Sequence, residues 1–121
     1  MSFFSKKTGD FGEKTAINYL QKKGFKIIDK NFRSRLGEID LVATKNKKIH
    51  FIEVKTRIGL GKGYPHEAVN PYKIKRIEKL LGLYLKDKKI KEMKLSLDVV
   101  SIILSRDRLI ENISFYESIT S

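Results

Sequence analysis

Apolar side chains recur along the chain with two periods, one typical of helices and the other typical of β-strands. Helical spacing occurs in two segments, and short runs rich in Ile, Val and Phe fill most of the remainder. The predicted elements, in order, are a helix at 10–23, strands at 25–32, 37–45 and 48–56, a helix at 71–86, and strands at 95–104 and 109–116. This order, αβββαββ, predicts an α/β (α+β) domain in which helices flank a mixed sheet.

Turn and cap residues support these boundaries. Gly24 supplies a stop for the first helix, and the Asn70–Pro71 pair suits the start of the second. The run 95–104, LSLDVVSIIL, is almost continuously apolar, which predicts a central strand buried on both faces. Between these elements, residues 58–67 (IGLGKGYPHE) carry three glycines and predict a flexible loop.

Length and composition indicate one soluble domain. The chain has 121 residues, of which 40% are hydrophobic and 33% charged, so we expect a single domain, 1–121, with its core at about 9–116. No apolar run reaches the roughly 20 residues of a membrane span, and the N-terminal residues lack the pattern of a secretory signal. The chain contains no cysteine. We therefore expect a cytoplasmic protein that does not enter a membrane.

The charge is strongly positive. Lys and Arg total 26 against 14 Asp and Glu, which gives a net charge of +12. A domain this basic commonly binds a polyanion, and nucleic acid is the usual one. Most of the basic residues are lysines, however, so a proteome that uses Lys as its default surface residue remains an alternative.

The predicted hairpin at 37–56 brings charged residues together on one face. If Asn46 and Lys47 form a two-residue turn, Asp40 lies opposite Glu53, and Glu38 lies opposite Lys55. Directly opposed side chains have Cβ atoms about 4.5–5.5 Å apart, and like charges at that distance are destabilising.

Two opposed carboxylates indicate a site for a hard divalent cation. Mg²⁺ and Mn²⁺ prefer oxygen ligands, and Mg²⁺ is commonly held by one or two carboxylates together with water and substrate phosphate. We therefore expect Asp40 and Glu53 to bind Mg²⁺ or Mn²⁺. The alternative is an edge hairpin whose acids are simply solvated.

Glu13 and Lys55 extend this constellation. Glu13 shares a helical stripe with Ala16, Ile17 and Leu20, so it points toward the sheet, although a carboxylate near a helix start also suits the helix dipole. Lys55 could orient a water or stabilise phosphate charge during attack. Its alternative role is a salt bridge to Glu38.

Several motifs resemble known families. Glu13, the GEID run at 37–40, twelve intervening residues and Glu53-Val54-Lys55 are similar to the PD-(D/E)XK nuclease superfamily, and their spacing resembles its Holliday-junction resolvase branch. The chain more closely resembles the bacterial YraN family over roughly 9–116. The residues that carry this closer resemblance are Gly12-Glu13, Asn31-Phe32-Arg33, GEID at 37–40, FIEVKTR at 51–57, Gly63, Pro65, 67–69, Lys73 and 98–100. Ile39 stands where the superfamily name has proline.

The resemblance implies a restriction-endonuclease-like core with a metal-dependent site. By that resemblance, Asp40 and Glu53 are metal ligands, Lys55 is the catalytic lysine, and Glu13 is a helical acid that supports metal or water. Lys73 stands where related nucleases often carry an auxiliary basic or amide residue. Small junction-cutting relatives are dimers, so a homodimer or a partner protein in DNA processing is compatible with this reading.

Basic residues near the predicted site are candidates for phosphate binding. Arg33 and Arg35 precede GEID, Arg57 follows Lys55, and Arg76 lies one turn after Lys73. Such contacts would position a phosphate backbone without reading its sequence, although a solvated helix face explains part of the set equally well. The sequence thus predicts a metal-dependent endonuclease, and it favours DNA over RNA as the substrate. The alternative is a nucleic-acid-binding or adaptor protein that keeps the nuclease fold without catalysis.

Overall fold

Two helices and five strands follow one another in the predicted order. The computed structural model describes residues 3–59, 71–90 and 94–117. The elements are α1 (Phe3–Lys22), β1 (Lys26–Ser34), β2 (Gly37–Lys45), β3 (Lys48–Ile58), α2 (Pro71–Asp87), β4 (Lys94–Leu104) and β5 (Ile110–Tyr116). The prediction of an αβββαββ order is confirmed.

The main difference from the prediction is the start of the first helix. α1 begins at Phe3, whereas the sequence pattern predicted a start at residue 10. Gly9 lies within the helix, and a Cβ built on it would meet no atom within 4 Å. A glycine costs a helix about 1 kcal/mol relative to alanine, which weakens the helix here without ending it.

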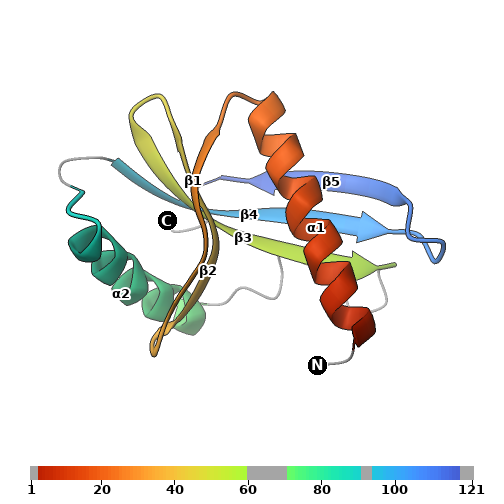
Figure 1. The fold of residues 1–121 in the computed structure, drawn as a ribbon, viewed down its shortest axis with the longest axis horizontal. Helices are drawn as coiled ribbons and strands as arrows, with labels where there is room; N and C mark the ends of the chain where they lie inside the picture. Colours follow the sequence, from red (N-terminus) through yellow and green to blue (C-terminus); the bar gives the residue numbers. More distant parts are fainter. Residues whose placement is uncertain (1–2, 60–70, 91–93, 118–121) are drawn as a thin grey trace.

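The strands form one mixed sheet in the order β1-β2-β3-β4-β5. Neighbouring strands are antiparallel except β3 and β4, which run parallel over Lys48–Ile58 and Lys94–Leu104. The chain between these two strands includes α2, as expected for a parallel crossover. The helices cover different parts of the sheet (Figure 1). The described elements therefore form a single α/β domain.

The core consists of two apolar clusters, one under each helix. Ala16 and Leu20 of α1 pack with Leu41, Ile52 and several β4 side chains in the first cluster. In the second cluster, α2 packs against side chains of β2, β3 and β4 that do not belong to the first cluster, including Phe51 and Leu97. The α2 residues are Ile77, Leu80, Leu81 and Tyr84. β4 contributes to both clusters and is buried from Ser96 to Leu104. This confirms the prediction of a central strand.

Gly12 sets the position of α1 on the sheet. A Cβ built on Gly12 would lie only 1.9 Å from Thr56 Oγ1 of β3. Any larger residue would therefore push the helix and the strand apart. The close approach places the next residue, Glu13, at the level of the second half of β3.

α2 contacts the turn between β1 and β2. Arg76 Nε donates a hydrogen bond to the Leu36 carbonyl oxygen, 3.2 Å away, and a Cβ built on Gly37 would lie 3.7 Å from Leu80. Within the residues described, neither helix is long and apolar enough to cross a membrane.

Candidate functional site

The β2–β3 hairpin has the predicted turn and register. Asn46 and Lys47 both have positive φ angles, 51° and 61°, as the two central residues of a type I′ turn require. The strand pairs run from Lys45↔Lys48 to Leu41↔Ile52. The next positions in this register are Asp40 and Glu53, as the sequence predicted.

Asp40 lies where the pairing between β2 and β3 ends. Its Oδ2 accepts a hydrogen bond from the Val54 backbone N–H at 2.7 Å. A carboxylate therefore takes the place that a backbone carbonyl of β2 would occupy in a continued ladder. β2 itself remains paired with β1 on its other edge through Glu38 and Ile39.

Burial and like charge act together on Asp40. The pKa of the Asp40 carboxyl is raised to about 7, first because burial removes it from water and second because of the Glu53 charge. The Val54 hydrogen bond and the Lys55 charge lower this pKa, while Glu38 raises it. Glu53 is only 8% exposed. Two carboxylates of the same sign thus share a largely buried position, which is unfavourable without a compensating cation.

Lys55 supplies part of that positive charge. Its Nζ lies 3.5 Å from Glu53 Oε2. The alternative partner, Glu38, instead pairs with Arg33, whose Nε lies 3.3 Å from Glu38 Oε1. Ile49 and Phe51 pack under α2, and strand alternation puts Glu53 and Lys55 on that same face.

Glu13 does not join the two carboxylates directly. It is partly buried, and its Oε1 accepts a hydrogen bond from Asn31 Nδ2 at 2.9 Å. Among the residues described, no three His, Cys, Asp or Glu side chains are close enough together to hold a metal ion. The structure therefore groups Asp40, Glu53 and Lys55. Glu13 is outside this group and is hydrogen-bonded to Asn31 of β1.

The donor set at this position fits a hard divalent cation. Asp40 and Glu53 offer carboxylate oxygens, no imidazole lies beside them among the residues described, and such ligands suit Mg²⁺ and Mn²⁺. Two protein carboxylates leave most of an octahedral coordination shell for water and phosphate oxygens. A divalent cation would also balance the two like charges, which Lys55 alone compensates only in part.

The predicted phosphate-binding residues lie around the β1–β2 turn and along β3. Arg35 is exposed in that turn, and Arg76 reaches the same turn from α2 through its bond to Leu36. Arg33 is 74% exposed at its side chain despite its ion pair with Glu38. Arg57 is partly buried near the end of β3. Lys73 belongs to α2, but its side chain lies outside what the structure describes.

Most of the predicted glycine loop also lies outside the described residues. This applies to residues 60–67 of the flexible loop predicted at 58–67. Gly59 is described: it has a φ of 70°, and its N–H donates to the Leu104 carbonyl oxygen at 3.0 Å.

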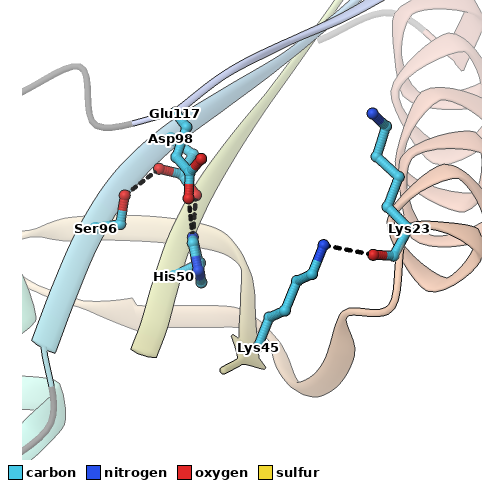
Figure 2. A network of polar contacts seen from close by, with 6 residues as sticks. All are labelled: Lys23, Lys45, His50, Ser96, Asp98 and Glu117. Atoms are coloured by element: carbon cyan, nitrogen blue, oxygen red, sulfur yellow. Dashed lines mark hydrogen bonds and ion pairs between the residues drawn. The ribbon is translucent and has the colours of Figure 1, made fainter. Parts of the chain in front are cut away.

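Sequence reasoning missed a second buried polar cluster. Figure 2 shows His50, Ser96 and Asp98 pointing toward one another from β3 and β4. Ser96 Oγ donates to Asp98 Oδ1 at 2.5 Å, and His50 Nδ1 lies 2.6 Å from Asp98 Oδ2. Glu117 Oε1 lies 3.8 Å from the same His50 nitrogen. The signal was available, because Asp98 interrupts an apolar strand just as Glu53 does.

His50 is buried on the face of β3 opposite Glu53. The His50 ring packs edge-on against Phe25, with ring centroids 4.8 Å apart, and Phe25 belongs to the cluster under α1.

Comparison with known proteins identifies the family of this chain. Residues 12–102 match the model of an uncharacterised protein family, UPF0102. A UPF0102 protein of Caldanaerobacter subterraneus subsp. tengcongensis is 41% identical over 110 residues, 90% of each chain. UPF0102 proteins of Dictyoglomus thermophilum and Syntrophomonas wolfei are 45% and 46% identical, over 84% and 83% of this chain and 86% and 87% of their own. The chain therefore belongs to the UPF0102 family, the YraN-like family that its motifs resemble.

Proposed function

We propose that this protein is a metal-dependent nuclease that hydrolyses phosphodiester bonds in DNA, with branched and single-stranded DNA as its candidate substrates. One observation carries the proposal: Asp40 and Glu53 are held together in a largely buried position, and the pKa of Asp40 rises to about 7 as a result. Strongly perturbed carboxylates of this kind are concentrated at functional sites.

The proposed mechanism assigns Asp40 and Glu53 to a Mg²⁺ or Mn²⁺ ion. Bound there, the ion would act as a Lewis acid toward a phosphate oxygen of the substrate. The hydrogen bond from the Val54 N–H to Asp40 Oδ2 would fix the orientation of the carboxylate that binds the ion. Glu53 would keep Lys55 close to the scissile phosphate through their 3.5 Å ion pair.

Lys55 has the charge and the position for the chemical step. Its side chain is 26% exposed, so its ammonium group can reach a bound phosphate while its stem remains packed. A cation there would orient the attacking water and stabilise negative charge that develops on the phosphate. Arg35, Arg57 and Arg76 would hold neighbouring phosphates, which positions the backbone without selecting a sequence.

A second candidate function is binding without catalysis. The observation that favours it is that, among the described residues, no third carboxylate joins Asp40 and Glu53 in a group that could hold a metal. In this case the protein would be a nucleic-acid-binding or adaptor protein in DNA processing. The basic residues at the β1–β2 turn would serve either function.

Calorimetry of Mn²⁺ binding tests the proposal first. We expect binding by the wild type and loss of binding in Asp40→Asn and Glu53→Gln. Asp107→Asn is a matched control, because Asp107 is an exposed acid in the β4–β5 turn. Binding should be followed by Mn²⁺-dependent cleavage of flapped, junction or single-stranded DNA. A wild type that binds DNA but neither takes up Mn²⁺ in its presence nor cleaves it would contradict the nuclease and support the adaptor.

A further inference from the structure

Asn31 has an unusual backbone conformation for a residue within a strand. Its φ of 53° lies in the left-handed region, which L-residues other than glycine rarely adopt, although asparagine tolerates it better than most. The other described non-glycine residues with positive φ lie in turns or beyond a helix end, namely Asn46, Lys47, Lys89 and Arg108. A turn requires such conformations, but a strand does not, so Asn31 needs a separate explanation.

The side chain of Asn31 points toward α1, whereas its neighbour points toward α2. Phe32 packs against Tyr84 of α2, with ring centroids 4.9 Å apart. The alternation of burial along β1 is interrupted at Asn31 and the residue before it, which are both exposed. The opposite directions of Asn31 and Phe32 are those of a regular strand, so the irregularity that accompanies the left-handed φ lies between Lys30 and Asn31.

The Asn31 amide is used to hold Glu13. Its Nδ2 donates to Glu13 Oε1 at 2.9 Å, across 18 residues of sequence and between two elements. A hydrogen bond to a carboxylate is stronger than one between neutral groups. This bond orients the Glu13 carboxylate toward β1.

The register places Asn31 opposite Asp40. The pairs Lys30↔Leu41 and Phe32↔Ile39 flank the two residues on β1 and β2. Asp40 in turn accepts the bond from Val54 on β3. Glu13, Asn31, Asp40 and the Val54 N–H therefore form a row of polar groups that runs from α1 across β1 and β2 to β3. On β3 this row ends at Val54, between Glu53 and Lys55.

We propose that Asn31 is a positioning residue of this site: its left-handed conformation aims the side-chain amide at Glu13 and so keeps the Glu13 carboxylate at the level of Asp40. Gly12 contributes from the other side, because its lack of a Cβ lets α1 approach Thr56 closely, beside the position of Glu13. This inference rests on the proposed function, because holding Glu13 affects turnover only if the site is catalytic.

Two substitutions at Asn31 separate its amide from its backbone conformation. Asn31→Gly keeps a residue that accepts positive φ and removes the donor. Asn31→Asp keeps the size and much of the tolerance for positive φ, but it places a negative charge against Glu13. Asn46→Gly is the matched control, because Asn46 has nearly the same φ, 51°, in the turn at the far end of β2.

The variants are compared by Mn²⁺-dependent cleavage of a 5′-flap DNA and by thermal unfolding. Loss of a group that orients a site residue typically costs about 10- to 100-fold, so we expect Asn31→Gly to lower kcat by that factor with little change in KM. Asn31→Asp should lose more. In the Glu13→Gln background, Asn31→Gly should cause less than a threefold further loss, because both changes then remove the same interaction. Asn46→Gly should behave as wild type.

The outcomes distinguish two failures. If the wild type cleaves and Asn31→Gly keeps the kcat of Asn46→Gly, the positioning role is overturned while the nuclease stands. Full multiplication of the two losses in the double variant would also overturn it, since Asn31 would then act independently of Glu13. A loss of kcat explained by partial unfolding at the assay temperature would have the same meaning. If the wild type neither binds Mn²⁺ nor cleaves, the proposed function fails and this inference fails with it.

Discussion

Two acids are wholly or partly buried on the strands that flank β3, Asp98 on β4 and Asp40 on β2, and their surroundings are opposite in character. Asp98 is fully buried and is surrounded by partners from its own chain: Ser96 donates to one oxygen, and His50 lies at hydrogen-bond distance from the other (Figure 2). Asp40 accepts a hydrogen bond from one backbone N–H. The neighbouring charge with the largest effect on its pKa is that of another acid, Glu53.

The difference separates an acid whose polar partners lie within the fold from one that, in the proposed function, binds a cation. A buried carboxylate with polar partners no longer needs water, so Asp98 joins β3 to β4 without requiring anything further. A carboxylate held next to a like charge is stable only when a cation or a proton joins it. The pKa of Asp40 is raised because burial and the Glu53 charge both disfavour its ionised form.

The largest expected effect is at Asp98. Asp98→Ala leaves the buried His50 and Ser96 side chains without their acceptor, and each buried polar group left unsatisfied typically costs about 1–3 kcal/mol, so about 2–6 kcal/mol for the two. We expect a loss of that size in the free energy of unfolding, measured by urea denaturation, with Asp107→Ala as the exposed control. A loss below about 1 kcal/mol would mean that the two regions do not differ as described.

The pH dependence of stability should follow Asp40. Because its folded-state pKa is raised from 3.8 to about 7, the folded chain binds this proton more tightly than the unfolded chain does. The Asp40 contribution to the free energy of unfolding should therefore be greatest below about pH 4, fall between pH 4 and 7, and be constant above about pH 8. We expect a fall on the order of 1–3 kcal/mol, since Asp40 is only partly shielded from solvent.

This pH dependence is measured as the difference between wild type and Asp40→Asn in urea denaturation at several pH values. Subtracting the variant removes the contributions that the two proteins share. Saturating Mn²⁺ should flatten the wild-type curve, because a bound cation replaces the proton. A difference that rises with pH would have the wrong sign and would contradict the raised pKa.

At pH 8 the two acids should respond to neutralisation in opposite directions. Asp40→Asn removes a buried like-charge repulsion and keeps an oxygen that can accept from Val54, so the free energy of unfolding should rise by about 1–2 kcal/mol. The same variant should lose Mn²⁺ binding. Asp98→Asn should lower stability under the same conditions, and equal destabilisation by both variants would remove the distinction.

The smallest effect is expected at Glu117. This residue is 51% exposed at its side chain and lies 3.8 Å from His50, and exposed ion pairs contribute between about 0 and 1 kcal/mol. Glu117→Gln should therefore change the free energy of unfolding by less than about 0.5 kcal/mol in urea denaturation. A loss as large as that of Asp98→Ala would place Glu117 inside the buried cluster instead.

The sequence was sufficient where local rules decide the structure. A two-residue turn at Asn46–Lys47 fixes the hairpin register, so the approach of Asp40 and Glu53 could be predicted from residue counting alone. The order of the elements followed from apolar periodicity in the same way.

The features that could not be predicted depend on contacts between distant elements. The left-handed conformation of Asn31 has a meaning only once α1 brings Glu13 beside β1. The partners of Asp98 come from the parallel pairing of β3 with β4, which no local pattern encodes. The early start of α1 at Phe3 reflects a helix that continues through Gly9 despite its low propensity.

The parallel pairing of β3 also has a consequence for synthesis on the ribosome. β2 precedes β3 directly, but β4 begins only at Lys94. Until that segment emerges, one edge of β3, a strand with three Ile, lacks its hydrogen-bond partner, and open edges of this kind readily pair with other chains. A nascent chain that stops before Lys94 would therefore carry both acids of the site on an unfinished sheet. Completion of the protein, rather than of the hairpin, is the step that makes the site permanent.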